Sequence, residues 1–261
     1  MTTTRPAPAV VSCAGVPITA GTRAQAARLV LDLASTPRPS GVDVHLCNAY
    51  TLALADRDPS YRDVLRGAAA NFPDGKSVVW ANRLLHRGLD LPDERVYGPD
   101  LFHDVLALGQ VVGLRHYLLG STRDVLAALD SRIRKLYPDA LVVGMDSPPF
   151  RDLTASELAD QAERIRSSGA QVVWVGLGTP KQDWEAARLA AGLPLVFVAV
   201  GAAFDFVAGT KPQAPLWMQR NGLEWTFRLA SEPRRLWRRY LFGNLRFLYA
   251  ASRHRPRAGA R

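Results

Sequence analysis

Short apolar runs recur along the chain, and longer stretches with helical spacing of apolar positions separate them. The runs are rich in Val and Leu and lack polar alternation, which is typical of parallel strands that are covered on both faces. We expect five such strands, at Val42–Cys47, Arg115–Gly120, Ala140–Gly144, Gln171–Gly178 and Leu193–Gly201.

The intervening stretches place apolar side chains along one face of a helix. We expect helices at Thr22–Ala34, Lys76–Leu85, Asp100–Leu108, Thr122–Leu136, Thr154–Ser167 and Lys181–Ala191. Because strands and helices alternate, the pattern predicts an α/β, Rossmann-like fold, with a twisted, mostly parallel sheet and helices on both faces.

The pattern changes past Phe204, where "AGTKPQAPLWMQRNG" carries two prolines and two glycines and no strand follows. Two helices are expected there, at Leu223–Ala230 and Pro233–Tyr249, with Pro233 in a first turn. We therefore divide the chain into an α/β body with a cleft, residues 1–205, and a helical appendage docked on it, residues 206–261. The two ends, 2–9 and 253–261, are expected to fray.

The net charge of +9 is concentrated in this appendage. The segment from Arg220 to Arg261 holds eleven arginines against Glu224 and Glu232, so it accounts for the entire excess. A neutral body with a basic tail indicates that the tail meets an anionic surface.

The last expected helix carries one basic and one apolar stripe: Arg235, Arg239 and Arg246, and Trp237, Leu241, Leu245 and Leu248. One interpretation is that the arginines meet anionic head groups while the apolar stripe packs on the body or enters lipid. The alternative is a helix that docks with its arginines in water.

Composition excludes several classes of protein. The two cysteines lack CxxC spacing, so a disulfide framework is not expected. We see no secretory signal, and the longest apolar runs fall short of the ~20 residues that a membrane-spanning helix needs. The histidines lack metal-ligand spacing, and "DRD" at Asp56–Asp58 is expected to be a solvated helix end, so neither a metal nor a cofactor is predicted.

Glycines follow three of the expected strands: Gly120 in "LLGSTRDV", Gly176 and Gly178 in "VGLGTPKQDW", and Gly201 in "VAVGAAFDF". Glycine lets a ligand approach the backbone, and the helix that follows offers free N–H groups to a phosphate. These turns favour a nucleotide or sugar-nucleotide site, although ordinary tight turns would look the same. None matches a GxGxxG or P-loop motif.

A single acidic residue stands out in "NFPDGKSVVW". Asp74 follows an apolar run and precedes an expected helix, so it is either a helix cap or a general base at a strand end. The local sequence favours the cap.

The ordered set of motifs resembles one family. The motifs "NAYT", "FPDGKSVV", "RVYGPDLF", "YLLGS", "VGLGTPKQDW", "GAAFDFVAGT", "APLWMQRNGLEW" and "RLASEPRRLWRRY" are similar in order and spacing to those of WecG/TagA/CpsF glycosyltransferases, glycosyltransferase family 26. The resemblance covers roughly residues 42–248.

The resemblance implies an inverting, metal-independent transferase that needs no cofactor. Such enzymes move N-acetylmannosamine-type sugars or other hexoses from a UDP-sugar donor to a sugar on polyprenyl diphosphate, for cell-wall, capsule or exopolysaccharide synthesis. It further implies a cytoplasmic protein, peripheral on the inner face of the membrane, with an anionic membrane surface as a partner. A homo-oligomer is left open.

The resemblance also implies roles for single residues. Asp74 matches the catalytic base, which reverses the local preference for a cap. Arg95 matches an arginine that handles the donor or its leaving diphosphate, Gln182 matches an active-site glutamine, and Asn48 matches a cleft residue.

Further substrate-binding positions are expected in the glycine-rich region and in the basic tail: Gly120, Gly176, Gly178, Gly201 and Asp205, and Arg235, Arg238 and Arg239. Three positions depart from the usual family pattern, namely Leu46, Gln213 and Asp183, and they bear on which sugar and acceptor are used.

Two other functions would share some of these features. A nicotinamide-dependent oxidoreductase would have this α/β pattern, but it needs a GxGxxG turn followed by an acidic residue ~20 positions on, and the sequence has none. A nucleic-acid-binding protein would use the Arg and aromatic tail, but this leaves Asp74, Arg95 and Gln182 without a role. We therefore expect no nucleic-acid partner.

Overall fold

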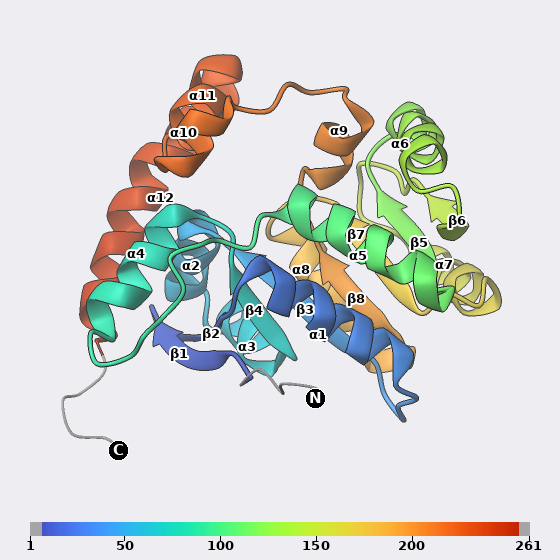
Figure 1. Ribbon diagram of the computed structural model, residues 1–261, viewed down its shortest axis with the longest axis horizontal. Helices are drawn as coiled ribbons and strands as arrows, with labels where there is room; N and C mark the ends of the chain where they lie inside the picture. Colours follow the sequence, from blue (N-terminus) through green and yellow to red (C-terminus); the bar gives the residue numbers. More distant parts are fainter. Residues whose placement is uncertain (1–6, 256–261) are drawn as a thin grey trace.

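The computed structural model describes residues 7–255 (Figure 1), so the two ends expected to fray lie largely outside the described residues. Within them, six parallel strands form one sheet in the order β4 (Ala70–Pro73), β3 (Val42–Cys47), β8 (Val196–Ala199), β7 (Val172–Gly176), β5 (Arg115–Gly120) and β6 (Leu141–Asp146). The five strands expected from the apolar runs are confirmed, and so is the α/β fold class.

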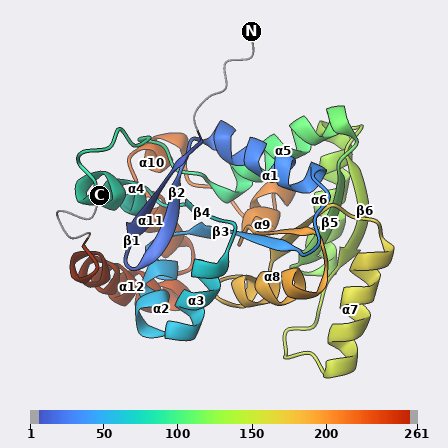
Figure 2. The same ribbon diagram turned by 90° about the horizontal axis from the view of Figure 1, so that it is seen from below.

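Helices cover both faces of the sheet (Figure 2). One face packs against α1 (Arg23–Ser35), α5 (Gly98–Val112), α6 (Arg123–Leu136) and α9 (Ala203–Ala208). The other packs against α7 (Ala155–Ser167) and α8 (Lys181–Gly192). Side chains on β7 alternate between the two, because successive residues of a strand point to opposite faces: Trp174 contacts Phe102 of α5, whereas Val173 and Val175 pack with α8.

The expected helix starts are confirmed at three threonines. Thr22, Thr122 and Thr154 each precede a helix, and each side-chain hydroxyl accepts a backbone N–H from the first turn. A hydroxyl at this position satisfies a donor that the helix itself leaves unpaired, which fixes where the helix begins.

The structure contains an N-terminal hairpin that the sequence analysis did not predict. Strands β1 (Ala9–Cys13) and β2 (Val16–Ala20) pair antiparallel around Ala14 and Gly15, which have φ of 52° and 78°. A two-residue hairpin turn needs positive φ at both positions, and the usual Asn–Gly or Asp–Gly signal is missing here.

The hairpin belongs to a third apolar cluster beside the sheet. It packs with α2 (Ala49–Arg57), α3 (Pro59–Gly67), α4 (Lys76–Leu85) and residues from the end of the chain. Three of its residues, Ala49, Phe247 and Ala251, also line the cavity between helices that is described in the next section.

The C-terminal segment contains α10 (Leu216–Arg220), α11 (Glu224–Ser231) and α12 (Pro233–Arg253). The last helix lies along α2 (Figure 1), and it buries Leu236, Phe247, Ala250 and Ala251. The apolar stripe expected to face the body or lipid is not packed into the body, because Trp237, Leu241, Leu245 and Leu248 are all exposed. The expected boundary at 205/206 falls inside α9, whose residues 203, 204 and 207 are buried in the sheet core.

Two arginines of the basic stripe of α12 contact the body, which corrects for these two the expectation that they meet anionic head groups or water. Arg246 Nε lies 2.7 Å from Asp56 Oδ2, and the guanidinium of Arg239 covers the Tyr50 ring at 4.4 Å. Asp56 is therefore a buried anchor and not a solvated helix end, while Asp58 caps α3. The side chain of Arg235 lies outside the described residues.

None of the helices described between residues 7 and 255 is long and apolar enough to cross a membrane.

Candidate active site

The carboxyl ends of all six strands open into one cavity of about 400 Å³, which we call the strand-end cavity. Each strand contributes lining residues from just beyond its end: Asp74 after β4, Asn48 after β3, Gly201 after β8, Gly178 after β7, Ser121 after β5 and Pro148 after β6. Ligands of open α/β sheets bind at this edge.

Glycine is required where the strands end closest together. A Cβ on Gly120 would lie 2.5 Å from the Gly176 carbonyl oxygen, and one on Gly176 would lie 2.8 Å from the Phe204 ring. Gly176, Gly178 and Gly201 line the cavity, whereas Gly120 lies behind its wall, next to the lining residue Ser121.

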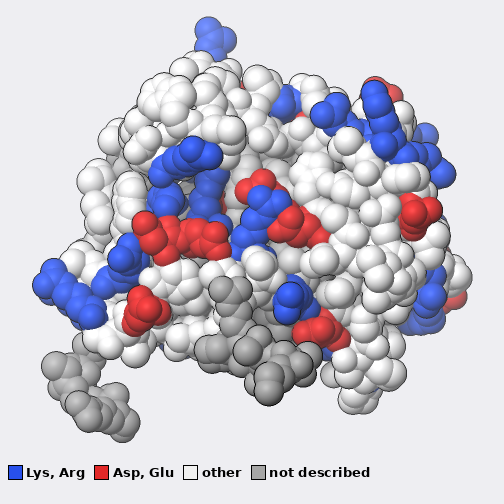
Figure 3. All heavy atoms as spheres, in the orientation of Figure 1, with Lys and Arg blue, Asp and Glu red and all other residues white. Residues whose placement is uncertain are grey.

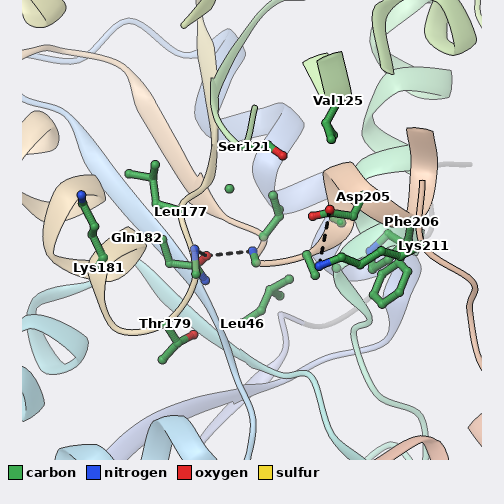
Figure 4. A pocket seen from close by; sticks show the side chains of 18 of the residues that line it. Leu46, Ser121, Val125, Leu177, Thr179, Lys181, Gln182, Asp205, Phe206 and Lys211 are labelled. Carbon is green, nitrogen blue, oxygen red and sulfur yellow. Dashed lines mark hydrogen bonds and ion pairs between the residues drawn. The ribbon is translucent and has the colours of Figure 1, made fainter. Parts of the chain in front are cut away.

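Gln182 joins two of these strand ends. Its buried side chain comes from the first turn of α8, and its Oε1 accepts the backbone N–H groups of Gly178 at 3.1 Å and Gly201 at 2.9 Å (Figure 4). The loops after β7 and β8 are therefore fixed relative to each other by one side chain.

A second cavity, of about 490 Å³, lies between α2, α4, α11 and α12, and we call it the helical cavity. Its walls are mainly apolar and include Trp80, Leu84, Trp225, Phe247 and Leu248. Four residues line both cavities: Asn48, Asp74, Arg228 and Arg239.

Asp74 stands where the two cavities meet. Its side chain does not cap α4, whose N-cap is Gly75 and has no side-chain cap, so the cap interpretation is wrong. Burial raises the pKa of Asp74 above its ordinary value, against the opposing charge of Arg95, and Glu224 raises it further. A carboxylate with a raised pKa is a better proton acceptor at neutral pH than an exposed one.

Arg95 lies on the helical side of Asp74 and lines only the helical cavity. Its guanidinium donates to Glu224 of α11 at 2.6 Å and to Gln219 at 3.1 Å, and it stacks on the Tyr97 ring at 4.1 Å. The pair with Glu224 is largely buried. The body is thus joined to the C-terminal helices directly beside Asp74.

Several cations surround the strand-end cavity. Lys181, Lys211, Arg228 and Arg239 line it, and Lys211 Nζ lies 3.6 Å from Asp205 Oδ1 (Figure 4). Arg228 is the first residue of the quoted "RLASEPRRLWRRY", but no local signal singles it out. Lys211 precedes "PQAP", where Gln213 departs from the usual family pattern. This departure is the sequence signal that lies nearest to Lys211.

The other expected residues are distributed as follows. Asn48 caps α2 by accepting the N–H groups of Tyr50 and Thr51, and it reaches both cavities. Asp205 lines the strand-end cavity, whereas Arg238 is exposed over the Trp237 ring and lines neither cavity.

Charges of both signs lie together on the face shown in Figure 3, where Lys and Arg side chains stand beside Asp and Glu side chains. Within residues 7–255, no group of three or more His, Cys, Asp or Glu side chains is arranged to hold a metal ion.

Comparison with known proteins agrees with the motif resemblance. The model of the "Glycosyl transferase WecG/TagA/CpsF family" matches residues 11–261. A protein of Bacillus subtilis (strain 168), "N-acetylglucosaminyldiphosphoundecaprenol N-acetyl-beta-D-mannosaminyltransferase", is 33% identical over 190 residues, which cover 72% of this chain and 70% of that protein. The resemblance read from the motifs is confirmed, and the chain belongs to the WecG/TagA/CpsF family of glycosyltransferases.

Proposed function

We propose that this enzyme moves a sugar, of the N-acetylmannosamine type or another hexose, from a UDP-sugar to a sugar on polyprenyl diphosphate. The reaction inverts the anomeric centre and needs no metal. One observation carries the proposal: the Asp74 carboxyl group lies where a polar cavity at the strand ends meets an apolar cavity between helices. Two chemically different substrates can therefore meet at one proton acceptor.

The strand-end cavity fits the donor. Its glycine-rich loops allow close approach of a diphosphate, and α6 and α8 begin at its rim, where helix N-termini favour anions. Lys211, Arg228 and Arg239 provide positive charge for the UDP that departs. Such fixed cations stabilise the charge that develops on a leaving group.

The helical cavity fits the acceptor. Its apolar walls suit the first units of a polyprenyl chain, and Arg95, Arg228 and Arg239 stand at the end nearest Asp74, where a diphosphate would lie. The Bacillus relative is named for a diphosphoundecaprenol acceptor, which supports this assignment.

In this proposal, Asp74 takes the proton from the acceptor hydroxyl as its oxygen attacks the anomeric carbon. The new bond joins that oxygen to the anomeric carbon, and the bond to the UDP oxygen breaks on the opposite side. The electron pair leaves with UDP, and the proton stays on Asp74. The raised pKa of Asp74 favours this transfer.

The exposed stripe of α12 fits a peripheral position on the inner face of the membrane. Leu241, Phe242 and Leu245 are each more than half exposed, and the exposed Arg234 and Arg238 flank them on the same helix. Residues 206–261 would then act as the part that engages the membrane, in keeping with an amphipathic helix at a lipid interface. The variant Leu241→Glu/Leu245→Glu should sediment less with anionic vesicles than the unsubstituted protein, and equal sedimentation would contradict this placement.

The reaction is tested by UDP release across a panel of UDP-sugars, with a polyprenyl-diphosphate-GlcNAc analogue as the acceptor and EDTA present. We expect release with one donor, dependent on the acceptor and unchanged by EDTA. Loss of release in EDTA would contradict metal independence. If no donor gives release and calorimetry detects no UDP binding, the proposed donor class is wrong.

A further inference from the structure

A buried charged cluster lies directly beneath the strand-end cavity. It joins His45 of β3, Asp43 of the same strand and Asp183 of α8, and all three are at most 7% exposed. His45 Nε2 lies 2.8 Å from Asp43 Oδ2, and His45 Nδ1 lies 3.0 Å from Asp183 Oδ1. The remaining carboxylate oxygen of Asp183 accepts the hydroxyl of Tyr61 on α3 at 2.8 Å.

The geometry requires the histidine to be charged. Each ring nitrogen faces a carboxylate oxygen, which only accepts hydrogen bonds, so both nitrogens must carry a proton. Burial alone lowers the pKa of His45, but the hydrogen bonds to Asp183 and Asp43 outweigh it and raise the pKa to about 9. A buried imidazolium between two carboxylates is costly to assemble and tolerates little change in geometry.

Two residues of the cluster are adjacent in sequence to residues that line the strand-end cavity. Asp183 follows Gln182, the residue whose amide oxygen holds the loops of Gly178 and Gly201. On the other arm, His45 precedes Leu46 on β3, which lines the strand-end cavity. One ion pair therefore fixes β3 relative to the first turn of α8.

A second buried histidine provides a contrast in the same sheet. His116 of β5 is also fully buried, but its Nδ1 accepts the indole N–H of Trp174 at 3.1 Å, and burial lowers its pKa to about 4. The His116 ring is neutral and lines neither cavity. Its hydrogen-bond partner, Trp174, lines neither cavity either. His116 therefore serves as a matched control for the loss of a buried imidazole.

We propose that His45 and Asp183 are positioning residues of the donor site, and that their ion pair holds α8 where Gln182 can clamp the loops after β7 and β8. This inference rests on the proposed function, because it takes the strand-end cavity as the site for UDP. The pair acts through Gln182 and touches neither substrate.

The test compares His45→Gln, Asp183→Asn and the double variant with His116→Gln, using UDP affinity by calorimetry. Both single variants should bind UDP on the order of tenfold more weakly, because residues that touch no ligand but lie in the network behind a site can alter binding by about 2- to 30-fold. The double variant should lose no more than either single one, because both changes break the same pair. His116→Gln should melt at a lower temperature but bind UDP as the unsubstituted protein does.

Three results would overturn the positioning role. One is an unchanged UDP affinity in His45→Gln while the unsubstituted protein binds UDP. Another is an equal loss of affinity in His116→Gln. The third is a His45 ring with only one protonated nitrogen at neutral pH, seen by nitrogen-15 NMR. If the unsubstituted protein binds no UDP, the proposed function fails and this inference fails with it.

A milder variant decides the question if His45→Gln does not fold. Tyr61→Phe removes only the hydroxyl that Asp183 accepts and keeps the ring that packs on Trp184. We expect weaker UDP binding, with the melting temperature close to that of the unsubstituted protein. UDP affinity equal to that of the unsubstituted protein would overturn the proposal.

Discussion

The two cavities that meet at Asp74 are built in different ways. The strand-end cavity is formed by backbone at the ends of parallel strands, and glycines, helix starts and one clamping glutamine define its shape. The helical cavity is formed by side chains of helices that lie up to about two hundred residues apart in sequence. Under the proposed function, the fixed backbone site would take a donor that many enzymes share, whereas the site made of side chains would be the one more easily altered to suit a particular acceptor.

The largest effect is expected at Asp74, one of the four residues that line both cavities. Asp74→Asn removes the proposed proton acceptor and should lower kcat by about 10²–10⁴-fold, while UDP affinity stays near that of the unsubstituted protein. Steady-state kinetics and calorimetry measure the two quantities. Near-normal turnover in a folded Asp74→Asn protein would remove Asp74 as the base.

A change on the helical side alone should shift the pH dependence. Glu224→Gln removes a negative charge that raises the pKa of Asp74. A negative neighbour favours the protonated carboxyl, so its loss lowers that pKa, and the rise of kcat with pH should begin at a lower pH. The pH–rate profile measures this, and a shift to higher pH would contradict the placement of Glu224 beside the base.

The apolar wall should matter only for acceptors with a long chain. Leu248→Glu places a charge in the helical cavity and should weaken a long-chain acceptor about tenfold or more, because covering one leucine contributes about 1.5–3 kcal/mol. A short-chain, water-soluble acceptor should be unaffected. Val111→Glu is the control, since Val111 is exposed on α5, away from α12, and lines neither cavity.

The smallest effect is expected from a half-exposed cation in the strand-end cavity. Lys211→Met should weaken UDP by about threefold and leave uridine unchanged, because a partly exposed charge pair contributes only up to about 1 kcal/mol. Lys135→Met, at the exposed end of α6, serves as the control. Equal losses for UDP and uridine would show that Lys211 does not act on the phosphates.

The strand-end cavity was largely predictable from the sequence, for a physical reason. Buried parallel strands leave a continuous apolar signal. Gly176 marks a close approach to Phe204, and Gly178 and Gly201 mark turns with positive φ. The helix starts at Thr122 and Lys181 follow from local capping and spacing. Each of these signals lies within a few residues of the feature that it encodes.

The helical cavity was not predictable in this way, because its parts come together only through tertiary packing. Nothing near Arg95 indicates that Glu224 will pair with it, 129 residues further along the chain. The spacing of α12 predicted outward arginines and left open whether the apolar stripe packs on the body or enters lipid. In the structure, Phe247 and Ala250 pack inward and Arg246 binds the buried Asp56. The period of a helix fixes which residues share a face, but not which face meets the body.

The packing of the hairpin with the end of α12 has a consequence for synthesis. The first strands and the last helix share one apolar cluster, and His254 lies against the turn at Gly15. Contacts between residues so far apart in sequence carry a large loop-closure entropy and form late in folding. A growing chain can complete its sheet and the loops at the strand ends before α12 has left the ribosome, whereas Arg228 and Arg239 join the strand-end cavity only with α11 and α12. The helical cavity also needs residues of α11 and α12, so both cavities reach their full lining only after these helices have packed on the body.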